Sequence, residues 1–207
     1  MGLRSPLTSP ASVQYRSPMN RLSLTGLLLA GMLSLSPSTA QAGWYVDPDI
    51  AKPAVGFNAN GSPGALDIEA TTNDGTLTDD GVNLLFTVPL ANVKTGIDLR
   101  DEHMKTKFMH VDQHPNVTLS IAHASLKLPT ELGKKTSGKN TAQFTALGVA
   151  KPTDLTWEVQ KTVAGYKLTG SFAFDISEHG VEVPSFMGVT VDSKMTARAV
   201  FYVVAKP

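Results

Sequence analysis

Cysteine is absent from the 207-residue chain. Its absence excludes disulfides, thiolate zinc sites, iron–sulfur clusters and a cysteine nucleophile, and leaves His, Asp and Glu as the side-chain metal ligands. A surplus of either charge is also absent, because 18 Lys and Arg residues balance 18 Asp and Glu residues. Nucleic-acid-binding proteins normally carry a basic surplus on one face, so we expect no nucleic-acid partner.

Common catalytic motifs are lacking as well. The chain contains neither a G-x-S-x-G turn, which would present a nucleophilic serine, nor a glycine-rich phosphate loop. We therefore expect no catalytic residues and no enzymatic activity.

The five histidines keep one alternative open, a metal or haem redox protein in which three or more of them converge. They are His103, His110, His114, His123 and His179. His110 and His114 lie four residues apart, a spacing that brings two ligands together only on a helix, and Pro115 disfavours a helix through His114. No H-E-x-x-H motif occurs. We therefore expect no metal site.

Long apolar runs are confined to the N-terminus. Arg21 precedes an apolar stretch from Leu22 to Leu35, and Ala40-Gln41-Ala42 follows it. This is the layout of a secretory signal peptide with an A-x-A cleavage site. We expect residues 1–42 to be an N-terminal extension and a cleaved signal peptide, whichever of Met1 and Met19 starts the chain. No later run approaches the roughly 20 apolar residues of a membrane-spanning helix.

The neutral charge balance is a sum over two unlike parts. Residues 1–42 contain three arginines and no acidic residue, whereas residues 43–207 contain 15 basic and 18 acidic residues. The predicted mature chain of 165 residues is therefore mildly acidic, with a formal net charge of −3.

Residues 43–207 show the pattern of a single β-domain. Apolar and polar residues alternate along 82–88, 117–122, 155–160, 166–176 and 195–203, which is typical of half-buried strands. Turn signals such as Asp80-Gly81 and Ala164-Gly165 separate these runs and indicate antiparallel pairing. We predict about eight antiparallel strands, closed as a barrel or folded as a sandwich because open sheet edges invite aggregation. Asp98 and Asp101 predict one short helix within residues 98–108.

The interior of such a barrel has two interpretations. Small residues expected to face inward share strands with bulky aromatic residues, so the small positions either leave room for a long apolar ligand or accommodate the rings. These small residues are Ala54, Ala142, Ala146, Gly170, Ala197 and Ala199.

Three separated segments carry a family resemblance. Residues 94–105 read KTGIDLRDEHMK, residues 147–152 read LGVAKP, and residues 177–184 read SEHGVEVP. Together with Trp44-Tyr45-Val46-Asp47-Pro48 they resemble the YceI-like family of exported lipid-binding proteins. The resemblance implies an extended lipocalin-like antiparallel β-barrel in the periplasm. It also implies binding, storage or transport of an amphiphile such as a polyisoprenoid, an isoprenoid quinone or a fatty amide.

The resemblance directs attention to an apolar lining and to one cation. The expected ligand-binding residues are Phe86, Leu119, Ile121, Phe144, Trp157, Phe172, Phe174 and Phe201, each of which has an alternative role as ordinary core. Arg100 either faces a head group at the barrel mouth or pairs with a neighbouring acid while Asp101 caps the helix. We expect no cofactor apart from a bound isoprenoid lipid or quinone. The oligomeric state, monomer or homodimer, stays open, as does a stress-response interaction module with a filled barrel.

Overall fold

The structure is a computed structural model that describes residues 43–206 except 63–65, 184 and 187–188. The predicted extension and signal peptide, residues 1–42, lie outside the described residues. Within the described part of the chain, no helix is both long and apolar enough to cross a bilayer.

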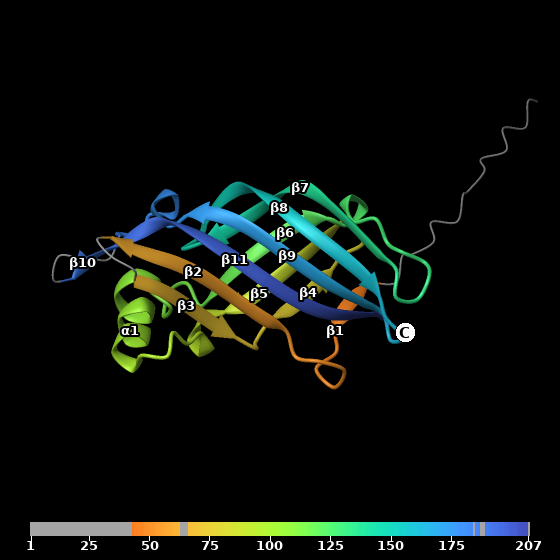
Figure 1. Ribbon diagram of the computed structural model, residues 1–207, viewed down its shortest axis with the longest axis horizontal. Helices are drawn as coiled ribbons and strands as arrows, with labels where there is room; N and C mark the ends of the chain where they lie inside the picture. Colours follow the sequence, from red (N-terminus) through yellow and green to blue (C-terminus); the bar gives the residue numbers. More distant parts are fainter. Residues whose placement is uncertain (1–42, 63–65, 184, 187–188, 207) are drawn as a thin grey trace, which may run out of the picture. The chain divides into compact units, whose positions relative to one another are not determined.

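Eleven strands form one antiparallel sheet that curls around an interior (Figure 1). Their order is β3-β2-β11-β9-β8-β7-β6-β5-β4, and the short strands β1 and β10 pair with β11. The strands are β1 (Trp44–Val46), β2 (Ala54–Ser62), β3 (Leu66–Thr72), β4 (Thr76–Asp79), β5 (Asn83–Pro89), β6 (Asn116–Ala122), β7 (Lys135–Ala146), β8 (Val149–Lys161), β9 (Tyr166–Asp175), β10 (Ser185–Phe186) and β11 (Val189–Ala205). The all-β prediction is confirmed. The strand count exceeds eight partly because β1 and β10, with three and two residues, are too short to show alternation.

The helical segments are short and lie between strands. Helix α1 (Asp98–His103) continues into a π-helical turn, Met104–Phe108, which confirms the short helix predicted within 98–108. Single 3-10 turns occupy Leu90–Asn92, His123–Ser125 and Ile176–His179. Helix α1 lies at one end of the barrel and β1 lies at the opposite end, near the C-terminus (Figure 1).

The barrel is a half-barrel, because in the described residues its two edge strands, β3 and β4, are not hydrogen-bonded to each other. Each end is instead closed by a local contact. Near α1, the backbones of Thr71 and Lys94 exchange two hydrogen bonds of 2.8 and 2.9 Å. At the other end β1 pairs with β11, and the Trp44 backbone N–H donates to Asp79 Oδ2 on β4 at 2.9 Å.

Asp79 is the buried polar centre of the β1 end. Besides Trp44, its carboxylate accepts a hydrogen bond from the Gly81 backbone N–H at 2.8 Å, and Oδ1 lies 3.2 Å from His123 Nδ1. The rings of Trp44 and His123 pack with centroids 4.7 Å apart, and Trp44 stacks on Tyr166 at 5.4 Å. The first strand, β1, is thus bonded to β11 on one side and to β4 on the other.

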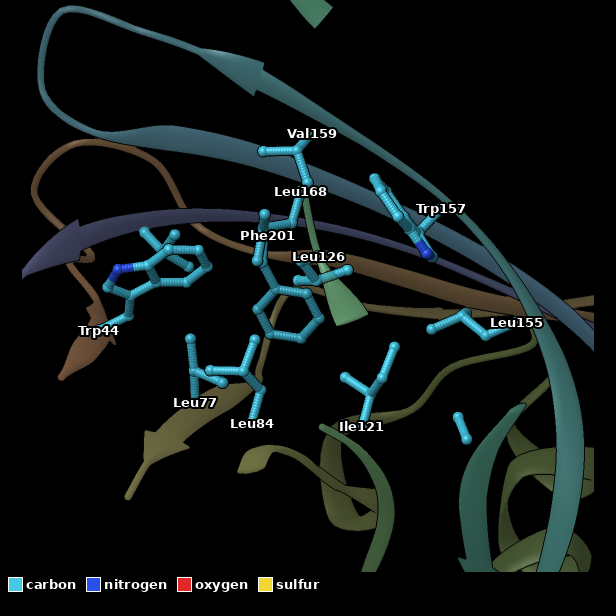
Figure 2. Close-up of a cluster of buried hydrophobic side chains, with 12 residues drawn as sticks. Trp44, Leu77, Leu84, Ile121, Leu126, Leu155, Trp157, Val159, Leu168 and Phe201 are labelled. Carbon is cyan, nitrogen blue, oxygen red and sulfur yellow. The ribbon is translucent and has the colours of Figure 1, made fainter. Parts of the chain in front are cut away.

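Two apolar clusters lie inside the barrel, one toward each end. The cluster at the β1 end is drawn in Figure 2, where side chains from different strands converge around Phe201. It contains Trp44, Leu77, Leu84, Ile121, Leu126, Ala142, Leu155, Trp157, Val159, Leu168, Phe201 and Val203. The cluster at the helix end contains Ala59, Ile68, Ala70, Leu90, Val93, Met109, Phe144, Ala146, Ile176, Val181 and Met195.

The interpretation in which Asp101 caps the helix and Arg100 pairs with a neighbouring acid is wrong, whereas a head-group role for Arg100 stays a prediction. Helix α1 begins after Ile97 without a side-chain cap, and the buried Asp101 carboxylate accepts hydrogen bonds from Thr95 N (2.7 Å) and Thr95 Oγ1 (2.5 Å). Arg100 pairs with no acid among the described residues; it donates from Nε to Thr95 Oγ1 at 2.8 Å and from a terminal nitrogen to the Thr95 carbonyl at 2.6 Å. Both side chains therefore fasten the helix to the segment that precedes it.

Burial and hydrogen bonding act in opposite directions on Asp101. Burial favours a higher pKa for this carboxyl, but the Thr95 hydrogen bonds and the charge of Lys94 outweigh it and hold the pKa below its ordinary value. Lys94 Nζ lies 3.8 Å from Asp101 Oδ2. The ionised carboxylate is thus the form that stabilises this corner of the fold.

The lowered pKa of Asp101 predicts a pH-dependent contribution to stability. A carboxyl whose folded pKa lies below its unfolded value of about 3.9 stabilises the fold above that pH. This stabilisation is lost as the pH falls through the folded pKa. We expect Asp101→Asn to lower the free energy of unfolding in urea at neutral pH, with a deficit that shrinks below about pH 4. The exposed neighbour Glu102→Gln is the control, and a deficit independent of pH would contradict the prediction.

The hydrogen bonds of Asp79 predict how much free energy of unfolding is lost when its carboxylate is removed. We expect Asp79→Ala to lower the free energy of unfolding by about 3 kcal/mol, because two backbone N–H groups and His123 lose a buried acceptor. The exposed Thr78→Ala on the same strand should change it by less than about 0.5 kcal/mol. Hydrogen exchange of the Trp44 amide should accelerate in Asp79→Ala, and an unchanged rate would show that this bond does not hold β1.

Candidate functional site

A large cavity lies inside the barrel and is lined by residues of both apolar clusters. Its volume is about 1020 Å³, at the upper end of the roughly 300–1,000 Å³ typical of ligand pockets. All nine residues expected to bind ligand line it: Phe86, Arg100, Leu119, Ile121, Phe144, Trp157, Phe172, Phe174 and Phe201. The structure therefore brings them together, while their contact with a ligand stays a prediction.

Strand register explains why these residues face one space. In the antiparallel pair β9 and β11, Phe172 lies opposite Ala197, and Gly170 lies opposite Ala199. Because paired residues point to the same side of a sheet, the Phe172 ring has a small neighbour on β11, whereas Phe174 lies opposite Met195. Small residues are thus interspersed with larger ones along the inner face, and the sheet encloses a volume that its own side chains do not fill.

The small residues divide between the two interpretations. Ala146, Gly170, Ala197 and Ala199 line the cavity, as the hollow interpretation requires. The inward placement was wrong for Ala54, which is exposed at the start of β2. Ala142 is buried in the apolar cluster at the β1 end.

The aromatic rings gather in two groups along the cavity. Phe144 packs against Phe172 and Phe174 with centroid distances of 5.1 and 4.8 Å. Toward the β1 end, Phe86 and Phe201 pack at 4.9 Å. These tilted contacts hold the rings in place without help from a ligand, so the lining is formed before anything binds.

Trp157 also occupies part of the inner face. Its Nε1–H donates to Asn140 Oδ1 at 2.8 Å. Directly across the strand pair, a Cβ on Gly138 would come within 2.7 Å of the Trp157 ring, so only glycine fits there. At this position a small residue does accommodate an aromatic ring.

Several inward-facing side chains keep accessible surface. Phe86, Leu119, Phe172 and Phe174 are half-buried although they point into the barrel. In a filled core such residues would be buried, as Leu84 is. The hollow interior argues against the filled-barrel alternative.

One group of polar residues in the lining lies at the helix end, while Thr72, Thr118, Glu158, Thr169 and Arg198 belong to strands β3, β6, β8, β9 and β11. Arg100, His103 and Lys107 line the cavity from α1 and the turn that follows it, and Thr95 lies beside them. Lys107 is exposed, which marks this end as the place where the cavity reaches the surface. The site thus combines an apolar interior with a basic opening.

The histidines do not converge. His123 lies at the β1 end against Asp79, while His179 Nδ1 lies 2.9 Å from the Val149 carbonyl oxygen. His103 lies at the cavity opening. Over the described residues, no three His, Asp or Glu side chains are arranged to hold a metal ion.

Some lining residues were missed by sequence reasoning. Val55 and Phe57 on β2 lie opposite Ala199 and Ala197 of β11 and line the cavity. Their strand reads AVGFNANGS, and its glycines and asparagines suppress the strand signal. Val55, Phe57 and Ala59 nevertheless alternate, so the period of two alone could have found them.

Comparisons with known proteins agree with this architecture. A YceI-like domain model matches residues 44–201. The chain is similar to a polyisoprenoid binding domain from Saccharophagus degradans implicated in plant cell wall breakdown, with 12% identity, coverage of 80% of this chain and 99% of that chain, and a TM-score of 0.64. It is also similar to BcnA of Burkholderia cenocepacia, with 14% identity, coverage of 77% and 99%, and a TM-score of 0.55. No curated relative matches the chain.

At these identities the two solved structures bear on the fold alone, which is lipocalin-like. The family model covers most of the β-domain, including the segments around α1 and the turn at residues 146–149. The chain therefore belongs to the YceI-like domain family.

Proposed function

We propose that the protein binds an amphiphilic lipid in its cavity and stores or carries it in the periplasm. The ligand classes are a polyisoprenoid, an isoprenoid quinone or a fatty amide. The observation that carries the proposal is the apolar interior of about 1020 Å³, whose lining includes eight aromatic and aliphatic side chains expected to contact a tail. The likeness to a polyisoprenoid binding domain supports the same ligand class.

Burial of the tail would supply the affinity. Removing apolar surface from water is worth about 25 cal/mol per Å², so a tail that buries roughly 400 Å² gains about 10 kcal/mol. Loss of ligand motion takes back part of this gain. The rings are already packed against one another, so little further ordering of the protein is required.

The basic opening would receive the polar end of the ligand. Arg100, His103 and Lys107 line this end, whereas Phe86 and Phe201 line the cavity toward the β1 end. Two of the nitrogens of Arg100 are engaged by Thr95, so its guanidinium is held in position. An amphiphile would therefore lie with its head at α1 and its tail toward the β1 end.

The periplasmic setting rests on the sequence of residues 1–42. A basic residue, an apolar run and an A-x-A site stand in the order of a secretory signal peptide. The absence of cysteine means that the exported domain would depend on its sheet and apolar clusters for stability.

Native mass spectrometry of protein taken from its own host tests the proposal. We expect a retained ligand, seen as added mass that is lost on denaturation and recovered by lipid extraction. Protein that carries no amphiphile under conditions that preserve the fold would contradict the proposal.

A second test uses a substitution whose side chain fills part of the cavity. Ala199 faces the interior opposite Gly170, and an indole there would occupy about 200 Å² of lining that a tail would otherwise contact. We expect Ala199→Trp to fold normally and to retain at least about tenfold less ligand. Val200→Trp, on the other face of β11, is the matched control. Equal ligand retention by both variants would show that the ligand does not lie in this cavity.

A further inference from the structure

Two large apolar side chains are exposed where the cavity reaches the surface. Ile97 is 54% exposed and Leu99 is 61% exposed, yet both line the cavity. The apolar surface of the interior therefore continues without interruption onto the outside of the protein at α1. Burial inside this domain does not account for these two residues, since more than half of each lies in solvent.

Charges on the same helix are sorted by side. Arg100, His103 and Lys107 line the cavity opening, whereas the exposed acids Asp98 and Glu102 do not. The charged side chains of this segment that line the opening are therefore the cations Arg100 and Lys107, although the segment as a whole contains both signs. We call Ile97, Leu99, Arg100, His103 and Lys107 the mouth surface.

The mouth surface is held in a fixed position. Thr95 connects to both Arg100 and Asp101 through four hydrogen bonds of 2.5–2.8 Å. Lys94, with its side chain 62% exposed, adds a further cation beside Asp101. Ile97 and Leu99 lie within this fastened segment, so they are presented together and at low entropic cost.

We propose that the mouth surface docks on the surface of an anionic phospholipid bilayer. Ile97 and Leu99 enter the interfacial region, and Arg100 and Lys107 face the lipid phosphates, the arrangement used by amphipathic membrane-surface helices. This rests on the proposed lipid-binding function, because docking would place the cavity opening against the source of its ligand. A second copy of the chain fits less well, since it would bring two basic surfaces together.

Vesicle flotation tests the docking. The probe is vesicles of phosphatidylethanolamine and phosphatidylglycerol, compared with vesicles of phosphatidylcholine. We expect Ile97→Glu/Leu99→Glu to bind the anionic vesicles at least about tenfold more weakly than the wild-type protein. Lys107→Gln should weaken binding about fivefold to the anionic vesicles only.

The matched control uses exposed apolar residues at the other end of the barrel. Val82 and Val163 are 68% and 91% exposed and lie in the turns before β5 and before β9. Val82→Glu/Val163→Glu adds the same charge and should bind the vesicles as the wild-type protein does. All variants share residues 1–42, so any contribution of that segment is common to them. Equal binding by both double variants would overturn the proposal.

A dye attached at a single position tests directly which part of the protein contacts the bilayer. Because the chain has no cysteine, Leu99→Cys and Val163→Cys can each be labelled at one position with an environment-sensitive nitrobenzoxadiazole dye. We expect anionic vesicles to raise the dye fluorescence at position 99 and leave it unchanged at position 163. A response of equal size at both positions, or a response at 99 caused by self-association without vesicles, would overturn the proposal.

The docking and the lipid-binding proposals can fail separately. Native mass spectrometry of the wild-type protein reports the retained ligand, and flotation reports the bilayer contact. A protein that retains ligand without binding vesicles overturns the docking alone. A protein that binds vesicles through the mouth surface without retaining an amphiphile overturns the lipid-binding function.

Discussion

The structure depends on how a curved sheet with two unpaired edges is kept open around a hollow interior. In the described residues, β3 and β4 share no ladder, so backbone hydrogen bonding alone does not close the barrel. Closure comes from the Trp44–Asp79 bond at one end and the Thr71–Lys94 bridge at the other. Two small polar contacts thus join the edges of the sheet around a space that apolar side chains would tend to collapse.

The apolar residues are arranged to resist that collapse. They form two clusters, one toward each end of the barrel, and residues of both clusters line the cavity; Leu119 and Phe172 pack against both. Tilted ring contacts hold the phenylalanine side chains against one another, for example Phe144 against Phe174 at 4.8 Å. The interior is therefore bounded by rigid groups, and its volume is a property of the folded chain before any ligand binds.

Strand alternation predicted the cavity wall well, because a period of two assigns every residue of a strand to one face. Phe172 and Phe174 on β9 are the clearest case. The same reasoning failed for Ala54, since alternation does not show where a strand leaves the core. A separate interpretation, in which Asp101 caps the helix, failed because the partner of Asp101 is Thr95, six residues earlier and outside the helix. Side-chain bonds across a turn depend on backbone geometry that composition and spacing do not specify.

The two ends of the barrel differ in chemistry, and this difference gives the molecule a direction. At the β1 end, Trp44 stacks on Tyr166 and packs at a tilt against His123, so that rings close the interior. At the helix end, Arg100 and Lys107 stand beside exposed apolar residues on a segment fastened by buried hydrogen bonds. An apolar chain gains most by moving away from the charged opening toward the sealed end, whereas a polar head loses hydration if it follows. Tail-first insertion with the head retained at α1 is therefore the arrangement that this asymmetry favours.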